Sequence, residues 1–375
     1  MEFQESAPAT RLAVSAQTAL PVVAQLLAHA ATGAALQSLT NGEAASGTDL
    51  ARQLQWLLDG GLGPLLHGAM GHAAVAQLPP TWRTALLSAD LTARVRHGSL
   101  TDTTLEIIET CERLGVDVVL LKGISVSEQW YPQEHFRPMA DIDVLIPQAD
   151  YGAVEAALID LGHERLAFEP GPGQQHGIPL QHRARGSLIE LHTRLFDDDS
   201  PLSAGTLFGT PVVMSGSVPS CFHGRPVRRL TSELQLAYIA SSWFNDLAER
   251  QIHPSFIASM FDAVFLLKAS AGTLDWKRLI DRLDNELAAA SLHAMLTYLP
   301  RFGVERPDAL VMARLASRQK LTGGAQLALI HAALDRHLIA AKPWNHLLPL
   351  PVPGRYSARH QIRKRLTRQP AHAQV

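Results

Sequence analysis

The sequence predicts an α+β protein in which a mixed sheet with helices is flanked by helical segments on both sides. Apolar residues recur at helical spacing before residue 115 and again after residue 230. Between these positions the chain contains short β-branched runs with a period of two. We therefore expect a helical segment over 1–114, an α/β core over 115–230, a helical domain over 231–350 and a basic, disordered tail over 351–375.

The composition is that of a globular protein in a reducing compartment. It is 46% hydrophobic and 18% charged. The 33 Lys and Arg residues nearly balance the 35 Asp and Glu residues, so the net charge does not indicate a particular partner. The two cysteines, Cys111 and Cys221, lie far apart without a CxxC motif, which argues against a disulfide framework or a zinc ribbon. The first eleven residues lack the pattern of a signal peptide, and no apolar run is long enough to span a membrane. The expected location is the cytoplasm.

The first hundred residues are rich in Ala and Leu at helical spacing. Examples are Leu54, Leu57 and Leu58, followed by Leu62, Leu65 and Leu66. Gly60-Gly61 and Pro79-Pro80 interrupt the pattern. The run 82–113 predicts one long helix or two, ending at Gly115 as a C-cap.

Three buried strands are predicted in the middle of the chain. Residues 116–121 form a β-branched apolar run, and 139–146 alternate apolar with acidic side chains. Residues 187–195 make the third strand. Helices are expected over 124–131 and over 151–161, the second ending at Gly162.

After the third strand, 211–230 is expected to form a hairpin or loop region, with Val212, Val213 and Val227 as strand residues. Helical spacing returns over four segments: 231–247, 254–269, 274–287 and 326–339. The last 24 residues contain no acid and six basic residues, namely Arg355, Arg359, Arg363, Lys364, Arg365 and Arg368. Such a tail can contact nucleic acid, but a solvated terminus is the favoured interpretation.

A pair of aspartates marks the second predicted strand. Asp141 and Asp143 are separated by one residue, so both carboxylates point to the same face, while Ile142 and Val144 fill the core. This arrangement suits a magnesium site, and phosphoryl-transfer sites hold such ions with shared carboxylates. Glu190 stands among apolar residues on the third strand and is the natural third ligand.

The turn after the first strand suggests a phosphate site. Lys122-Gly123 leads from a strand into a helix, a junction where backbone N–H groups can approach a triphosphate, with Lys122 and Ser125 as side-chain partners. Lys122 is equally well explained as a solvated strand end. Arg137 can bind a phosphate or the Asp141 carboxylate, or serve a structural ion pair.

The order of these motifs resembles the uncharacterised bacterial nucleotidyltransferase family of the DNA polymerase β superfamily, over about residues 116–303. The resemblance rests on Leu121-Lys122-Gly123, Arg137, residues 141–146 and the Ile189-Glu190-Leu191-His192 run. It implies a polymerase β-like core in which Asp141 and Asp143 hold two Mg²⁺ ions. Glu190 would hold the catalytic metal and help to deprotonate the acceptor, and Gly123 and Ser125 would cradle the β- and γ-phosphates. In this sequence Ile124 separates Gly123 from the small residue that follows it directly in the family.

The expected activity is Mg²⁺-dependent transfer of NMP from an NTP, such as ATP, to an acceptor, with release of pyrophosphate. The acceptor is a small molecule, peptide, protein or RNA, which the sequence does not decide. The alternative is a non-catalytic nucleotide-binding or protein-interaction module with the same fold.

Four further polar residues have open roles. His176, His182 and His192 match no zinc motif, so a three-histidine metal site and a hydrolase built on it are disfavoured. His192 lies on the Glu190 face by period two. Asp262 either approaches the nucleotide or serves a cap or salt bridge.

Overall fold

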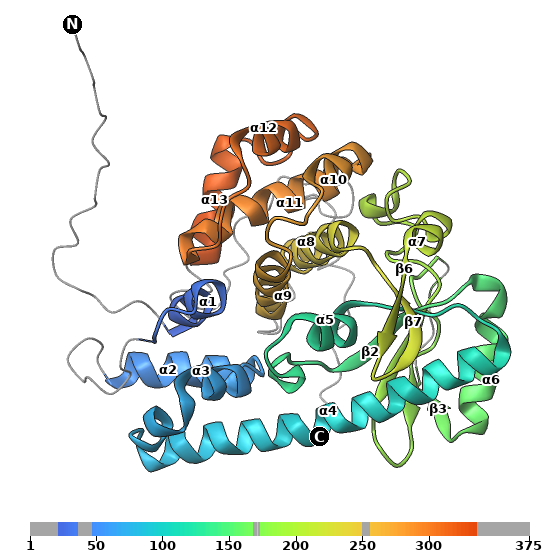
Figure 1. Cartoon of the computed structure of the whole chain (residues 1–375), viewed down its shortest axis with the longest axis horizontal. Coiled ribbons are helices and arrows are strands. Elements are labelled where there is room, and N and C mark those ends of the chain that lie inside the picture. The colour runs from blue at the N-terminus through green and yellow to red at the C-terminus, as the bar shows by residue number, and fades with distance from the viewer. Residues whose placement is uncertain (1–21, 37–46, 168–170, 172, 250–255, 336–375) are drawn as a thin grey trace, which may run out of the picture.

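A seven-stranded mixed sheet runs through the middle of the chain in the computed structural model, which describes residues 22–36, 47–167, 171, 173–249 and 256–335 (Figure 1). The strand order is β3-β4-β5-β2-β1-β7-β6. The strands are β1 Val119–Leu120, β2 Asp141–Leu145, β3 His163–Arg165, β4 Leu180–His182, β5 Leu188–His192, β6 Val218–Phe222 and β7 Arg225–Arg229.

The three predicted central strands are present but shorter than expected. β2 pairs in parallel with β5 and antiparallel with β1. Ile142 and Val144 are fully buried in β2, as the alternation of apolar residues requires. The strands β3 and β4 were not predicted, because Glu164, Arg165 and Gln181 give them no apolar alternation.

Residues 211–230 form a hairpin only in their second half. β6 and β7 pair antiparallel across His223 and Gly224, whose φ angles of 45° and 81° suit the turn of a tight hairpin. The expectation that Val212 and Val213 are strand residues was wrong. Both lie in α7 (Thr210–Gly216), where a proline at the first turn favours a helix and Val213 is buried.

Helices α4 and α6 lie against the sheet (Figure 1). The long helix α4 (Pro80–Leu114) is a single helix of 35 residues and ends at Gly115 with φ 68°, which confirms the predicted C-cap. Its buried Ile107, Ile108 and Cys111 join the core residues of the sheet. α6 (Tyr151–Asp160) ends where Gly162 was expected to stop it. α5 (Lys122–Trp130) begins two residues before its predicted start.

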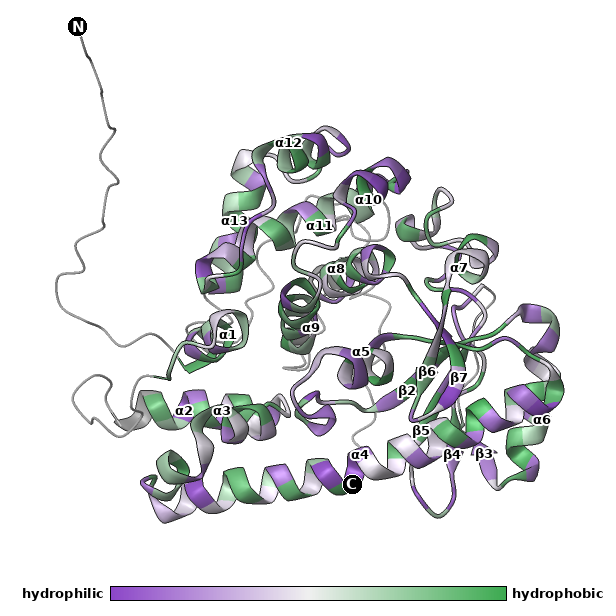
Figure 2. Cartoon of the chain, viewed as in Figure 1, coloured by the Kyte–Doolittle hydropathy of each residue, from purple (hydrophilic) through white to green (hydrophobic). Residues whose placement is uncertain are grey.

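The helices from the two ends of the chain share one core. α1 (Val22–Thr32) packs against α9 (Phe256–Ala269), and α8 (Ser232–Glu249) packs against α9 and α11 (Glu286–Tyr298). Apolar residues of α8 and α9 lie at the centre of this helical layer (Figure 2). The other helices are α2 Gly47–Asp59, α3 Gly63–Ala76, α10 Trp276–Arg282, α12 Ala309–Ser317 and α13 Gly324–Leu334.

The helix expected over 274–287 is divided in two. α10 ends at Arg282, and α11 starts after Asn285, whose side chain accepts a hydrogen bond from the Ala288 N–H and caps the new helix. The segment predicted over 326–339 corresponds to α13, and its last residues and the basic tail lie outside the described residues. Among the helices that the structure describes, none is long and apolar enough to span a membrane.

Candidate active site

Two neighbouring parallel strands bring the predicted acids together. In the register of β2 and β5, Asp143 pairs with Glu190. Since side chains alternate along a strand, Asp141 lies on the same face two residues earlier, and His192 lies there two residues after Glu190. Oxygen and nitrogen atoms of Asp143, Glu190 and His192 lie within 4.8 Å of one another. Asp141 and Asp143 open onto a common cavity.

Two cations contact the Asp143 carboxylate. The Lys122 Nζ lies 3.2 Å from Asp143 Oδ1, and His192 Nε2 donates to the same oxygen at 2.7 Å. Although burial acts in the opposite direction, these cations hold the pKa of Asp143 well below its usual range. Within the described parts of the chain, no cation lies at hydrogen-bond distance from Asp141, and burial together with the charges of Asp143 and Glu190 raises its pKa to about 6. Negative charge in the site is therefore only partly compensated.

His192 is part of this cluster. It is fully buried, and its Nε2 lies 3.5 Å from Glu190 Oε2 as well as beside Asp143. Burial favours the neutral ring, but hydrogen bonds to the two carboxylates raise the pKa of His192. His176 stands over it, with ring centres 5.4 Å apart, and its Nε2 lies 3.6 Å from Glu190 Oε2. His192 therefore lies on the same face of the sheet as the acids and also contacts Asp143 and Glu190 directly.

Lys122 and Gly123 form the turn at the start of α5. Lys122 has φ 38°, in the left-handed region that non-glycine residues rarely adopt, and such strain is common where structure holds a functional side chain in place. A Cβ at Gly123 would lie 2.5 Å from Arg137 Nη1 and 2.8 Å from Met139 Sδ. Close packing against Arg137 accounts for this glycine, and its phosphate contact stays a prediction.

Arg137 makes a structural ion pair across the cavity. Its Nε and Nη2 donate to the two carboxylate oxygens of Asp262 at 3.2 and 2.8 Å, and Tyr131 Oη donates to Oδ1 at 2.7 Å. Arg137 precedes β2, whereas Asp262 belongs to α9, so the pair fixes the sheet to the helical layer. Of the roles considered for Arg137 and Asp262, the salt bridge is the one present.

Ser125 is not among the residues that line the cavity beside Asp141 and Asp143. It is fully buried in α5, where Arg229 Nη1 donates to its carbonyl at 2.7 Å and Gln129 Nε2 donates to its hydroxyl at 3.2 Å. Arg229 is itself 1% exposed and is paired with Glu128. The phosphate contact of Ser125 stays a prediction.

The cavity beside the acids has a volume of about 370 Å³. Lys122, Asp141 and Asp143 form one wall, and α8 forms the opposite one. The α8 residues in the lining are Tyr238, Ile239, Ser242, Asn245 and Asp246. Sequence reasoning missed this wall, although polar residues at positions i, i+4, i+7 and i+8 of an apolar helix are a recognisable stripe. Asp197, from the loop after β5, also lines the cavity.

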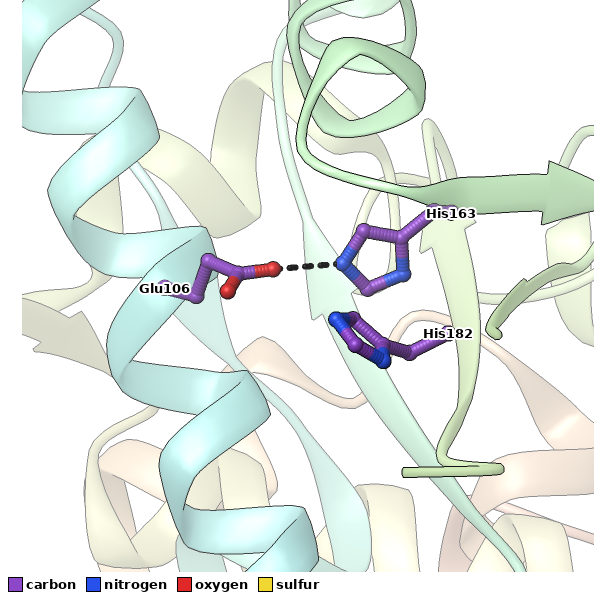
Figure 3. A group of neighbouring side chains, drawn as sticks. All are labelled: Glu106, His163 and His182. Atoms are coloured by element: carbon purple, nitrogen blue, oxygen red, sulfur yellow. Dashed lines mark hydrogen bonds and ion pairs between the residues drawn. The ribbon is translucent and has the colours of Figure 1, made fainter. Parts of the chain in front are cut away.

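A second group of polar residues lies on the far part of the sheet. Figure 3 shows Glu106 of α4 facing His163 of β3 and His182 of β4, and His163 Nε2 donates to Glu106 at 2.6 Å. The backbone N–H groups of Ala184 and Arg185 donate to His182 Nδ1 at 3.2 and 3.1 Å. The ring proton is then on Nε2, so that nitrogen has no lone pair for a metal.

This second group is therefore an ion-pair network. Arg185 donates to the other oxygen of Glu106 at 2.7 Å, and together with His163 it lowers the pKa of that carboxylate despite burial. The network fixes β3 and β4 to α4. His182 belongs to this network, whereas His176 and His192 lie together beside Glu190. The three histidines therefore do not form one site.

Comparisons with known proteins give the family of the chain. A family model described as an uncharacterised nucleotidyltransferase matches residues 46–303. Among solved structures, that of the antibiotic-resistance factor ANT(2'')-Ia aligns with 45% of this chain and 89% of its own, at 16% identity and a TM-score of 0.30. No curated protein matches the chain.

Proposed function

Because the chain belongs to the uncharacterised nucleotidyltransferase family, we propose that it uses Mg²⁺ to transfer NMP from an NTP to an acceptor hydroxyl and releases pyrophosphate. The core is proposed to work as in the DNA polymerase β superfamily. The observation that carries this proposal is the register of β2 and β5, which sets Asp143 beside Glu190 with Asp141 on the same face.

The residues present fit a pair of hard cations. Carboxylate oxygens are the ligands that Mg²⁺ prefers. Burial, and then the negative charges of Asp143 and Glu190, raise the pKa of Asp141, and a bound cation would offset both effects. We assign Asp141 and Asp143 to both ions and Glu190 to the catalytic one. When bound, the ions neutralise charge that develops on the transferred phosphoryl group.

The protein's own side chains supply the remaining steps. The Lys122 ammonium lines the cavity next to Asp143, where it can attract a phosphate oxygen. Glu190 accepts the proton of the acceptor hydroxyl. His192 acts as a positioning residue, because its hydrogen bond fixes the orientation of the Asp143 carboxylate.

A non-catalytic nucleotide-binding module is the alternative, and pyrophosphate release separates the two. Wild-type protein should release pyrophosphate from at least one of the four NTPs when Mg²⁺ and a metabolite extract are present. EDTA or Asp143→Asn should abolish the release, since both remove the metal. The matched control is Asp160→Asn, which removes one carboxylate at the exposed end of α6. Binding of nucleotide without any pyrophosphate release would favour the module.

A further inference from the structure

The first half of α4 carries a row of exposed apolar side chains. Leu87, Leu91 and Val95 are 41%, 63% and 74% exposed, and their spacing of four residues places them on one face of the helix. Val95 is the most exposed large apolar residue in the part of the chain that the structure describes. Apolar residues scattered singly are ordinary on a surface, whereas a contiguous row indicates a binding surface.

A cavity of about 540 Å³ lies beside this row. Leu91 and Val95 line it together with Arg96 of the same helix, and Arg185 and Ser187, between β4 and β5, line it as well. A second cavity, of about 440 Å³, adjoins it and also contains Arg96 in its lining. We call the two cavities together the α4 groove. Neither Asp nor Glu occurs among the described residues that line the α4 groove.

Arg96 supplies a positive charge to both parts of the α4 groove. Its Nη2 donates to the carbonyl oxygen of Ala140 at 3.4 Å, and no carboxylate within the described ranges forms an ion pair with it. Arg185, in contrast, is paired with Glu106. Arg96 is therefore available for a carboxylate of a ligand, which a guanidinium group binds through charge-assisted hydrogen bonds.

The α4 groove reaches the active-site cavity at residues 137–140. Arg137 and Pro138 line both the cavity of 440 Å³ and the cavity beside the acids. Ala140 lines the cavity of 540 Å³ and the cavity beside the acids, and Asp141 follows it directly in the chain. A ligand that lies along α4 therefore has a short path for one of its groups to the assigned metal site.

A peptide segment with apolar and acidic side chains fits this surface. Leu87 lies outside both cavities and eight residues before Val95, which corresponds to about 12 Å along a helix axis. A small molecule that fills one cavity would leave part of the row exposed, whereas an extended peptide covers it. The carboxylate of the peptide complements Arg96. An anionic membrane has the same charge, but a bilayer surface would leave the cavities unfilled.

We propose that the acceptor is a hydroxyl side chain of a peptide that docks on the α4 groove through apolar and acidic residues; this rests on the proposed function. The hydroxyl oxygen of a serine, threonine or tyrosine forms a bond to the α-phosphorus of the NTP. The bond from that phosphorus to the oxygen bridging to the β-phosphate breaks, and pyrophosphate leaves with the electron pair. The hydroxyl proton passes to Glu190.

Phage display of random peptides tests docking without requiring turnover. The bait is the full chain saturated with Mg²⁺ and a non-hydrolysable NTP analogue. The enriched peptides should combine Asp or Glu with apolar residues, and their synthetic, fluorescein-labelled forms should bind in fluorescence anisotropy. Enrichment of basic peptides, or binding of the chain to phosphatidylserine vesicles without any enriched peptide, would overturn the proposal.

Exposed variants locate the bound peptide on α4. Arg96→Glu and Val95→Asp should each raise the Kd of a selected peptide by about tenfold. The matched controls are Arg278→Glu on α10 and Leu310→Asp on α12, where Leu310 is 70% exposed, and both should leave the Kd unchanged. Circular dichroism checks that all four variants fold. Equal Kd values for all variants would overturn the proposal.

Two further measurements separate the peptide from other occupants. Analytical ultracentrifugation should give the same oligomeric state for the wild type and Val95→Asp, because a dimer that this change dissociates would make the face an interface between copies. Pyrophosphate release in the metabolite extract should stop once a protease, removed afterwards, has digested its peptides. Release that persists would overturn the peptide acceptor and leave the transferase function standing. Absence of release before digestion, from any NTP, would overturn the transferase function itself.

Discussion

Lys122 combines a strained backbone with a contact to a buried carboxylate, which makes it the residue most directly open to test. Lys122→Met removes the ammonium while retaining most of the side-chain length. We expect kcat/KM for the Mg²⁺-bound NTP to fall by about 10²-fold, because a positive charge next to the reacting phosphate is lost. Steady-state pyrophosphate release measures this change. Lys277→Met, at a 77% exposed side chain, is the control and should retain full activity.

A substitution at Gly123 tests whether close packing against Arg137 is the reason for a glycine at this position. In Gly123→Ala the new Cβ would meet Arg137, which Asp262 holds in place, so we expect a loss of about 1–3 kcal/mol in the free energy of unfolding. Gly98→Ala is the matched control, because no atom lies within 4 Å of its Cβ position in the middle of α4. That change should stabilise the protein by about 0.5–1 kcal/mol. Urea unfolding of both variants measures these changes in the free energy of unfolding. Equal changes in the two variants would contradict the packing argument.

At the scale of elements, a buried hydrogen bond joins α4 to the short helix η1 (Glu134–Phe136). Asp90 of α4 accepts a hydrogen bond from His135 Nε2 at 3.0 Å. Burial lowers the pKa of His135 below its usual 6.5, even though Asp90 acts in the opposite direction. The folded protein thus binds this proton less readily than the unfolded chain does. The contribution of His135 to stability is present above pH 6.5 and is lost as the pH falls through the lowered pKa.

His135→Gln removes this titration and should make the melting temperature less sensitive to acid. The difference in melting temperature between wild type and variant should change between about pH 7 and pH 5, with the wild type losing more stability. Scanning calorimetry over this range measures it. A difference that does not vary with pH would show that His135 does not titrate in this way.

Elements with strong apolar periodicity were predictable from the sequence, and those stabilised by distant contacts were not. The alternation of Ile142 and Val144 with acids predicted β2, and Gly115 predicted the end of α4. β3 carries charged residues and is held in part by the contact of His163 with Glu106, which is 57 positions away. Val212 and Val213 favour a strand by propensity, but the preceding residues start a helix and tertiary packing buries Val213.

At the scale of the whole molecule, the cavity joins segments that are far apart in the chain. The acids on β2 and β5 follow from period two and could be predicted from local sequence. The Arg137–Asp262 pair joins positions 125 residues apart, and the α8 wall faces the strands only because the helical layer packs there. Which polar residues of a helix face a site depends on that packing. The face that carries the acids was therefore predictable, whereas the α8 wall of the cavity was not.

The most direct test of the account separates nucleotide binding from turnover by changing one acid at a time. Asp143→Asn should weaken binding of the Mg²⁺–NTP complex and abolish turnover together, because this carboxylate is assigned to both ions. Glu190→Gln should leave nucleotide binding nearly intact while pyrophosphate release falls by about 10²-fold or more, because Glu190 acts mainly on the acceptor hydroxyl. Parallel calorimetry and pyrophosphate assays on the wild type and both variants measure these effects. Turnover by Glu190→Gln at the wild-type rate would contradict the assignment.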